Sequence, residues 1–108
     1  MTKRIVDKDH LQYVSTLSCM ICGARKQIQV HHLLKPYDGM RGLSMRAGDN
    51  NVVPLCFQHH TELHTKFGNE EKFFIHHGYF AGTGRQVAKN LWESRTMHDD
   101  EVDDGLPF

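Results

Sequence analysis

Residues 51–64, NVVPLCFQHHTELH, are the stretch that decides the fold. The apolar run 51–55 predicts a short strand that leads directly into Cys56. A helix is expected from residue 57 to residue 66 or 67, because Gly68 supplies a C-terminal stop. The sequence therefore predicts a strand that passes straight into a helix, with a cysteine at the junction.

Four residues around this junction have the spacing of a structural zinc site. Cys19-x-x-Cys22 and Cys56-x-x-His59 supply two ligand pairs, with 34 positions from the second cysteine to the third. Two such pairs make a closed tetrahedral set, and an odd cysteine count in a reducing compartment favours metal over disulfides. The alternative is that Cys19 and Cys22 are small buried apolar residues and His59 lies on a helix surface. We favour zinc because both spacings match known knuckles.

A second set of histidines remains once the zinc ligands are assigned. His60 and His64 stand four residues apart, so on a helix they share one face and can bind one ion. His59 is rotated by about 100° from His60, which lets one helix serve two sites. The alternative is a solvated helix face. We predict a metal site because histidines at i and i+4 are a known ligand arrangement.

Two further histidines, His31 and His32, are expected near the end of a strand over residues 27–34, QIQVHHLL. Side chains alternate along a strand, so the two rings face opposite sides. One can bind metal while its neighbour faces substrate. The alternative for His32 is a partly buried histidine bonded to the backbone.

The other predicted elements are helical. We expect helices over residues 8–17, 70–77 and 85–95, the last of them with Thr83 as its N-cap. Trp92 is expected in the core. No role is assigned to four remaining histidines, which are His10, His76, His77 and His98.

The end of the chain differs in composition from the rest. Residues 98–108, HDDEVDDGLPF, cannot bury enough apolar surface and are predicted to be a disordered acidic tail behind a domain formed by residues 1–97. Thirteen basic and eight acidic residues precede residue 99, so that part carries a net charge of +5 and the tail carries −5. A mildly basic body fits a polyanionic partner, although many proteins that bind no nucleic acid share this charge.

Length and hydropathy limit the class of protein. A chain of 108 residues is expected to form one domain. It contains no run approaching the roughly 18 apolar residues of a membrane span, and residues 1–10 lack the apolar stretch of a signal peptide. We therefore expect an intracellular protein that does not enter a membrane.

Together these motifs resemble the His-Asn-His endonucleases with a ββα-metal fold, over roughly residues 9–95. The resemblance is closest to phage nucleases related to the recombination enhancement function protein. It implies an α+β fold, a small zinc-stabilised, treble-clef-like domain with flanking helices. The motifs that carry it are CMICG at 19–23, VHHL at 30–33, GMRGLSMRAGD at 39–49, NVVPLC at 51–56, HHTELH at 59–64 and AKNLW at 88–92.

The resemblance also implies a mechanism, the hydrolysis of DNA phosphodiester bonds by a phage-derived enzyme linked to recombination or DNA processing. His32 would be the general base, and Asn51 would brace the loop, with Asn50 as a possible substitute and Asp49 as a loop organiser. Mg²⁺ or another divalent cation would be held by His31, His60 and His64. Many relatives have a cysteine where this chain has His59, so His59 and His60 could exchange roles.

Two segments suggest partners. Lys35, Arg41 and Arg46 could contact DNA phosphates, although a solvated loop is nearly as good an explanation for any one of them. The tail resembles that of bacterial single-stranded DNA-binding proteins, which implies docking on the host proteins that bind those tails. The residues that would carry this docking are Asp103, Asp104, Leu106, Pro107 and Phe108. The alternative is a solvating tail, or one that folds back on the basic body.

Two other functions are compatible with these motifs. One is a zinc-stabilised DNA-binding module without catalysis, and the other is a recombination accessory protein that recruits host proteins through its tail. Each of these functions, like the nuclease, places the protein in the cytoplasm of a bacterial host cell.

Overall fold

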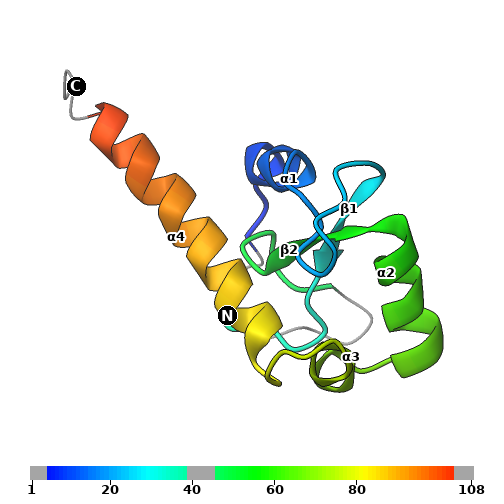
Figure 1. The fold of residues 1–108 in the computed structure, drawn as a ribbon. Helices are drawn as coiled ribbons and strands as arrows, with labels where there is room; N and C mark the ends of the chain where they lie inside the picture. The colour runs from blue at the N-terminus through cyan, green and yellow to red at the C-terminus, as the bar shows by residue number, and fades with distance from the viewer. Residues whose placement is uncertain (1–4, 39–45, 104–108) are drawn as a thin grey trace.

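The computed structural model describes the backbone of residues 5–38 and 46–103, and their side chains as far as residue 95. It is a small α+β fold, as expected, in which helices surround a two-stranded sheet (Figure 1). In chain order the described elements are α1 (Lys8–Ser15), β1 (Ile28–His32), β2 (Val52–Cys56), α2 (Phe57–Glu62), the π-helical turn η1 (Leu63–Phe67), α3 (Glu70–His76) and α4 (Thr83–Asp103).

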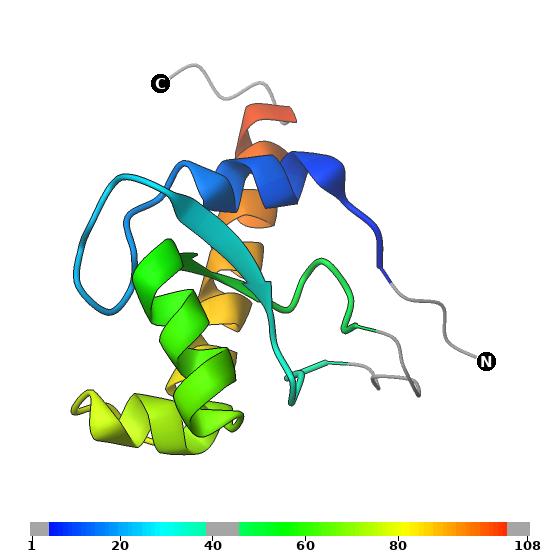
Figure 2. The same ribbon diagram turned by 90° about the vertical axis from the view of Figure 1, so that its right-hand side faces the viewer.

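The strands β1 and β2 pair antiparallel, with Ile28 opposite Cys56 and His32 opposite Val52. All five residues of β2 are buried, because α1, α2 and α4 all pack against this strand. The ribbon shows α4 on one side of the sheet and α2 on the other, with α1 across its end (Figures 1 and 2). β1 is shorter than the expected span of 27–34, but both histidines lie within it.

The outer edge of β2 carries a proline. The carbonyl of Pro54 accepts a hydrogen bond from the backbone N–H of Met20 at 3.1 Å, so this carbonyl faces away from β1. Proline lacks a backbone donor and is tolerated at a sheet edge for that reason. Because Met20 follows Cys19, this bond joins the first cysteine loop to the strand that ends in Cys56.

The predicted helix after Cys56 is present, and it changes type before it ends. Residues 57–62 are α-helical, and residues 63–67 widen into a π-helical turn. Gly68 stops the helix with φ of 60°, as expected, and its N–H bonds to the carbonyl of Leu63 at 2.7 Å. Such turns are rare and often occur at functional sites.

The helix α3 forms as predicted, with Asn69 as its N-cap, and brings two phenylalanines into the core. Phe73 and Phe74 are fully buried against Leu33, Val53, Leu55, Leu63 and Ala88. This core lies beneath the sheet, between α3 and α4. The predicted helix over 8–17 is shorter at its C-terminus than expected, since α1 ends at Ser15.

The last helix corrects one predicted boundary. α4 continues to Asp103 rather than ending near residue 95. Residues 96–103 contain neither glycine nor proline, and the first strong helix breaker downstream is Gly105. Residues 104–108 lie outside the described residues. No helix in the described part of the chain is long and apolar enough to cross a membrane.

Trp92 is only partly buried, which corrects its assignment to the core. Its ring lies edge-on to the buried ring of His10, with centroids 4.9 Å apart. Arg95 donates a hydrogen bond from Nε to Nδ1 of His10 at 3.0 Å and pairs with Asp7 at 2.7 Å. His10, to which the sequence assigned no role, therefore joins α1 to α4.

Gly84 allows the close approach of α4 to the core, and its replacement by alanine should destabilise the fold. A Cβ atom at Gly84 would lie 2.6 Å from the ring of Phe74 and 3.3 Å from Leu33. We expect Gly84→Ala to lower the free energy of unfolding by about 1–3 kcal/mol, the usual cost of overpacking. Urea denaturation followed by circular dichroism measures this change.

Gly82→Ala is the matched control, because its Cβ would meet only ordinary contacts, 3.4 Å from Arg85 and 3.7 Å from Phe80. The control should stay within about 0.5 kcal/mol of the natural protein. Equal stability of the two variants would show that the packing argument is wrong.

Candidate metal centre

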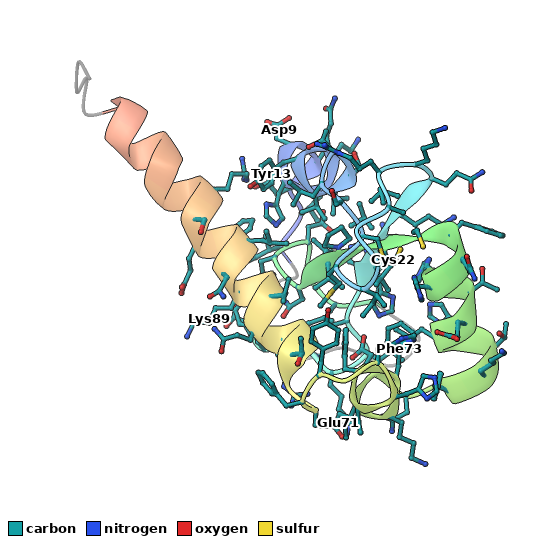
Figure 3. The ribbon with its side chains drawn as sticks, viewed as in Figure 1. Asp9, Tyr13, Cys22, Glu71, Phe73 and Lys89 are labelled. Carbon is teal, nitrogen blue, oxygen red and sulfur yellow. The ribbon has the colours of Figure 1, made fainter. Side chains whose placement is uncertain are left out.

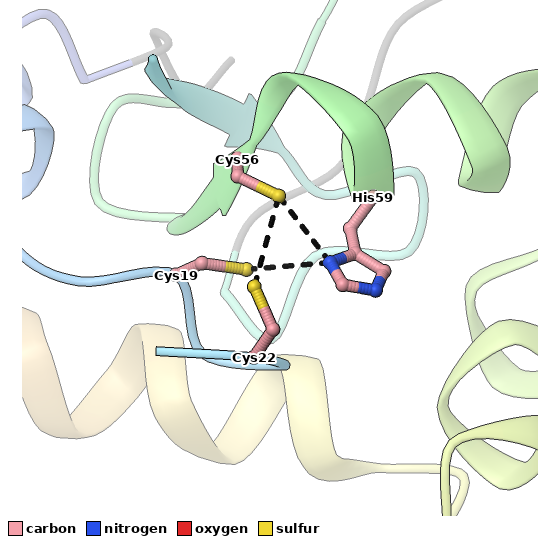
Figure 4. Close-up of side chains that lie close together, drawn as sticks. All are labelled: Cys19, Cys22, Cys56 and His59. Atoms are coloured by element: carbon pink, nitrogen blue, oxygen red, sulfur yellow. Dashed lines mark hydrogen bonds between the residues drawn. The ribbon is translucent and has the colours of Figure 1, made fainter. Parts of the chain in front are cut away.

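Three cysteines and one histidine converge where the first loop, β2 and α2 meet. Nδ1 of His59 lies 3.3 Å from Sγ of Cys56 and 3.8 Å from Sγ of Cys19, and Sγ of Cys22 lies 3.9 Å from Sγ of Cys56 (Figure 4). All three cysteines are free thiols. The structure therefore brings together the four residues that the sequence predicts as zinc ligands.

These distances fit the dimensions of a tetrahedral zinc site. Zn–S bonds of about 2.3 Å and Zn–N bonds of about 2.05 Å place two sulfurs about 3.8 Å apart, and a sulfur and a nitrogen about 3.6 Å apart. The observed separations of 3.9, 3.8 and 3.3 Å lie close to these values. The four side chains could hold a metal ion such as zinc.

The backbone of the first loop prepares the cysteines for this role. Gly23 adopts φ of 78° and donates its N–H to the carbonyl of Cys19, while the N–H of Ile21 points to Sγ of Cys19 at 3.4 Å. Burial alone would raise the pKa of the Cys19 thiol, but hydrogen bonds from backbone amides outweigh it and lower this pKa. A lower thiol pKa favours the thiolate, which is the form that binds metal.

A second cluster contains the other three histidines that the sequence predicts as metal ligands. Nε2 of His60 lies 3.1 Å from Nδ1 of His31 and 3.1 Å from Nε2 of His64. His31 comes from β1 and is buried, whereas His60 lies on α2 and His64 on the π-helical turn. The rings of His60 and His64 are adjacent, with centroids 4.7 Å apart, as their spacing of four residues predicts.

The hydrogen bonds on the far sides of the His31 and His60 rings indicate which kind of ligand the histidine cluster could hold. Nε2 of His31 donates to the carboxylate of Glu70 at 2.6 Å, and Nδ1 of His60 donates to Oε1 of Gln29 at 2.5 Å. Each ring therefore presents an unprotonated nitrogen to the other. Burial, with His31 and His64 nearby, lowers the pKa of His60 to about 4, so a proton does not bridge these lone pairs near neutral pH. A divalent cation would satisfy all three nitrogens.

Glu70 lies behind the histidine cluster, and sequence reasoning did not single it out. Its side chain is buried and accepts hydrogen bonds from His31, from the N–H of Leu34 at 2.6 Å and from the N–H of Lys35 at 3.1 Å. It stands 39 residues from His31, so only its position in the first turn of α3, after an N-cap, distinguishes it in the sequence. A carboxylate at a helix N-terminus is stabilised by the helix dipole.

His32 faces a different partner from that of His31. Nε2 of His32 donates to Oδ1 of Asp49 at 2.8 Å, and both side chains are nearly buried. The other oxygen of Asp49 accepts the backbone N–H of Asp7 at 2.8 Å. This bond gives Asp49 the role of orienting the ring of His32.

Asn51 makes the contacts expected of a bracing residue. Its Oδ1 accepts the N–H of Tyr37 at 2.8 Å and the N–H of Asp38 at 3.3 Å, and its Nδ2 donates to the carbonyl of Asp38 at 3.1 Å. Asn50 adds a bond to the Asp38 carboxylate at 3.1 Å. Both asparagines are buried, so the segment after β1 is held against the start of β2.

A third group of possible metal ligands shares His59 with the cysteine cluster. Glu62 and His77 pair at 2.6 Å, and the rings of His59 and His77 lie 5.1 Å apart. Nδ1 of His59 faces the sulfurs of Cys19 and Cys56. The carboxylate of Glu62 bonds to the ring of His77, so this group offers a carboxylate and two imidazoles within reach of one another. The sequence analysis assigned no role to His77.

Two of the three basic residues that are predicted to contact phosphates lie within the described part of the chain. Lys35 is exposed and pairs with Glu71 at 3.2 Å, and Arg46 is also exposed. Arg41 lies outside the described residues. The structure thus leaves Lys35 and Arg46 available to a ligand, and their contact with DNA stays a prediction.

Comparison with known proteins gives a family. Residues 1–83 match the family model described as "Protein of unknown function (DUF968)", and they include every ligand of both clusters. The chain belongs to the DUF968 family.

One relative of this DUF968 chain is described as "Uncharacterized protein YdfU". The protein YdfU of Escherichia coli (strain K12) is 38% identical over 63 residues, which are 58% of this chain and 17% of YdfU. The chain thus spans less than a fifth of that relative's length. No solved structure matches the chain.

Removal of metal from this DUF968 protein should unfold it. A small domain depends strongly on the free energy of metal binding, so excess chelator should abolish helicity and the cooperative melting transition. Cys56→Ser should do the same without chelator, and zinc added back should refold the natural protein but not the variant. Circular dichroism and elemental analysis measure these outcomes. Unchanged helicity and melting in excess chelator would contradict a structural metal.

Loss of the Glu70 charge should weaken the histidine cluster. Groups behind metal ligands typically change affinity 10- to 100-fold, so we expect Glu70→Gln to weaken Mn²⁺ binding by about that factor. Titration calorimetry on zinc-loaded protein measures it. Glu71→Gln is the matched control, because Glu71 pairs with Lys35 and Arg85 instead of a histidine. Equal Mn²⁺ affinities for the two variants would exclude this role for Glu70.

Proposed function

We propose that this protein is a divalent-metal-dependent endonuclease that hydrolyses phosphodiester bonds in DNA. The observation that carries the proposal is the convergence of His31, His60 and His64, whose neighbouring ring nitrogens lie 3.1 Å apart. His32, the residue after His31, carries an imidazole that Asp49 orients. Three protein ligands leave coordination positions open for substrate, as catalytic metal sites require. The resemblance to His-Asn-His endonucleases supports the same assignment.

Each residue has a defined part in this mechanism. His31, His60 and His64 would hold the ion, which supplies stabilisation of negative charge on the phosphate and on the leaving 3′ oxygen. His32 accepts a proton from water, and Asp49 stabilises the imidazolium that forms. Asn51 keeps the loop that starts after β1 in position, and Lys35, Arg41 and Arg46 contact phosphates.

The finer description of the fold belongs to this proposal. A hairpin whose second strand enters a helix, with histidines from both facing one another, supports a ββα-metal fold. The ligand pairs on a loop and on the strand–helix junction support a treble-clef-like zinc site. We assign Zn²⁺ to the cysteine cluster and Mg²⁺ or another divalent cation to the histidine cluster.

The cellular setting is proposed from the resemblance alone. The protein is phage-derived, acts in the cytoplasm of a bacterial host cell, and docks through its C-terminal residues on host proteins that bind single-stranded DNA-binding protein tails. Asp103 ends α4, and the other residues of this motif, Asp104, Leu106, Pro107 and Phe108, lie outside the described residues.

Plasmid cleavage with Mg²⁺ or Mn²⁺ tests the proposal. A general base contributes about 10²- to 10⁴-fold to the rate, so His32→Ala should lose at least 100-fold while the variant stays folded with its zinc content unchanged. His76→Ala is the matched control, because His76 is an exposed histidine on α3 that belongs to neither cluster. Its cleavage rate should equal that of the natural protein.

Two results would overturn parts of this assignment. If pure His32→Ala cleaved DNA as fast as the natural protein does, His32 would not be the general base. If the metal-loaded natural protein bound DNA but cleaved no plasmid, single-stranded or branched DNA, the function would be that of a zinc-stabilised binding module instead.

A further inference from the structure

A shallow groove lies away from both histidine and cysteine clusters, between the segment that follows β1 and the start of α4. It encloses about 420 Å³, within the range of small-ligand sites. Its lining combines two aromatic rings, Tyr37 and Phe80, with two cationic side chains, Arg85 and Lys89. None of these four residues belongs to the proposed catalytic set.

Phe80 is exposed but held in place. Its side chain is 64% accessible to solvent, the largest exposed fraction among the large apolar residues of the described chain. Its backbone N–H donates to Oγ1 of Thr83 at 3.1 Å, and the Thr83 hydroxyl donates to the Phe80 carbonyl at 2.7 Å. The segment before α4 thus presents an aromatic face to solvent from a fixed backbone.

Gly82 keeps the space between the Phe80 ring and the guanidinium of Arg85 open. A Cβ atom at position 82 would lie 3.4 Å from Nη2 of Arg85 and 3.7 Å from the Phe80 ring. Any larger side chain would fill the floor of the groove. The ring and the guanidinium therefore border the same narrow space.

The charge of the groove is positive. Arg85 and Lys89 stand one helical turn apart on α4, and Lys35 and Arg85 both pair with Glu71. Figure 3 labels Lys89 on α4 and Glu71 on α3. Glu71 is the shared partner of Lys35 and Arg85, at 3.2 and 3.4 Å, so this carboxylate pairs with two cations, and Lys89 adds a further positive charge to the lining of the groove. This excess of positive charge suits a phosphate-bearing ligand.

We infer that the groove binds an unpaired nucleotide of single-stranded DNA. The base stacks on the Phe80 ring, and the flanking phosphates contact Arg85 and Lys89, which is the combination that single-strand binding proteins use. A duplex hides the faces of its bases in the stack, so the groove selects for unpaired substrate. The inference rests on the proposed function in one respect, that the bound strand is the nuclease substrate.

The groove is also connected to the proposed catalytic residues. Tyr37 lines it, and the N–H of Tyr37 is held by Asn51 at 2.8 Å. Lys35, two residues earlier, is held through its N–H by Glu70, which also binds His31. A strand seated in the groove therefore lies on the same braced segment that leaves β1 after His32.

Fluorescence anisotropy with a labelled oligothymidylate and a labelled hairpin duplex tests this inference. Binding is measured on the full chain with zinc bound and without added Mg²⁺ or Mn²⁺. We expect Phe80→Ala to weaken single-strand binding roughly tenfold to a hundredfold and to change duplex binding less than twofold. Phe80→Tyr should retain single-strand binding, because tyrosine also stacks.

Phe57→Ala is the matched control, since Phe57 is 54% exposed but does not line the groove. It should bind both probes as the natural protein does. Lys89→Gln should reduce the slope of log affinity against log salt by about 0.7 on the single strand, the value for one lost phosphate contact.

The outcomes separate this inference from the proposed function. Single-strand binding that depends on Phe80, together with an absence of cleavage, would support the groove and reject the nuclease. If Phe80→Ala binds the oligothymidylate as tightly as Phe57→Ala, or loses duplex binding to the same extent, the groove does not bind an unpaired base, whatever the cleavage result.

Discussion

One buried carboxylate at the start of α3 constrains the rest of the site. Taking the charge of Glu70 out of water costs on the order of several kcal/mol, and three N–H donors offset that cost. They come from the ring of His31 and the backbone of Leu34 and Lys35, all at the end of β1. The same contacts set the tautomer of His31 and hold α3 against the sheet, so the histidine cluster and the segment after β1 depend on one side chain.

The parts of the structure that the sequence predicted are those with local signals. The strand–helix junction at Cys56, the stop at Gly68 and the i, i+4 relation of His60 and His64 follow from periodicity and chain stereochemistry within a few residues. The cysteine cluster could be predicted for a related reason, because the paired spacings of its residues restrict where their side chains can meet. These signals were enough to predict which residues come together in both clusters.

The parts of the structure that the sequence did not predict depend on contacts between segments far apart in the chain. Glu70 meets His31 across 39 residues, and Arg95 meets His10 across 85. Asp49 was considered only as a loop organiser, because nothing local shows that its carboxylate reaches His32. The end of α4 was missed for a different reason, because the polar composition after residue 95 was weighed above the lack of glycine and proline that allows the helix to continue to Asp103. Composition thus gave a poorer estimate of that boundary than backbone stereochemistry did.

Pro54 has a consequence for the behaviour of many copies at high concentration. Unpaired backbone donors and acceptors along the edge of a sheet can recruit a strand from another molecule and so begin aggregation. On the outer side of β2, Pro54 offers no donor, and its carbonyl is already bonded to Met20. A foreign strand would find this position blocked, so the most apolar strand of the protein is protected from intermolecular pairing along its outer edge at that point.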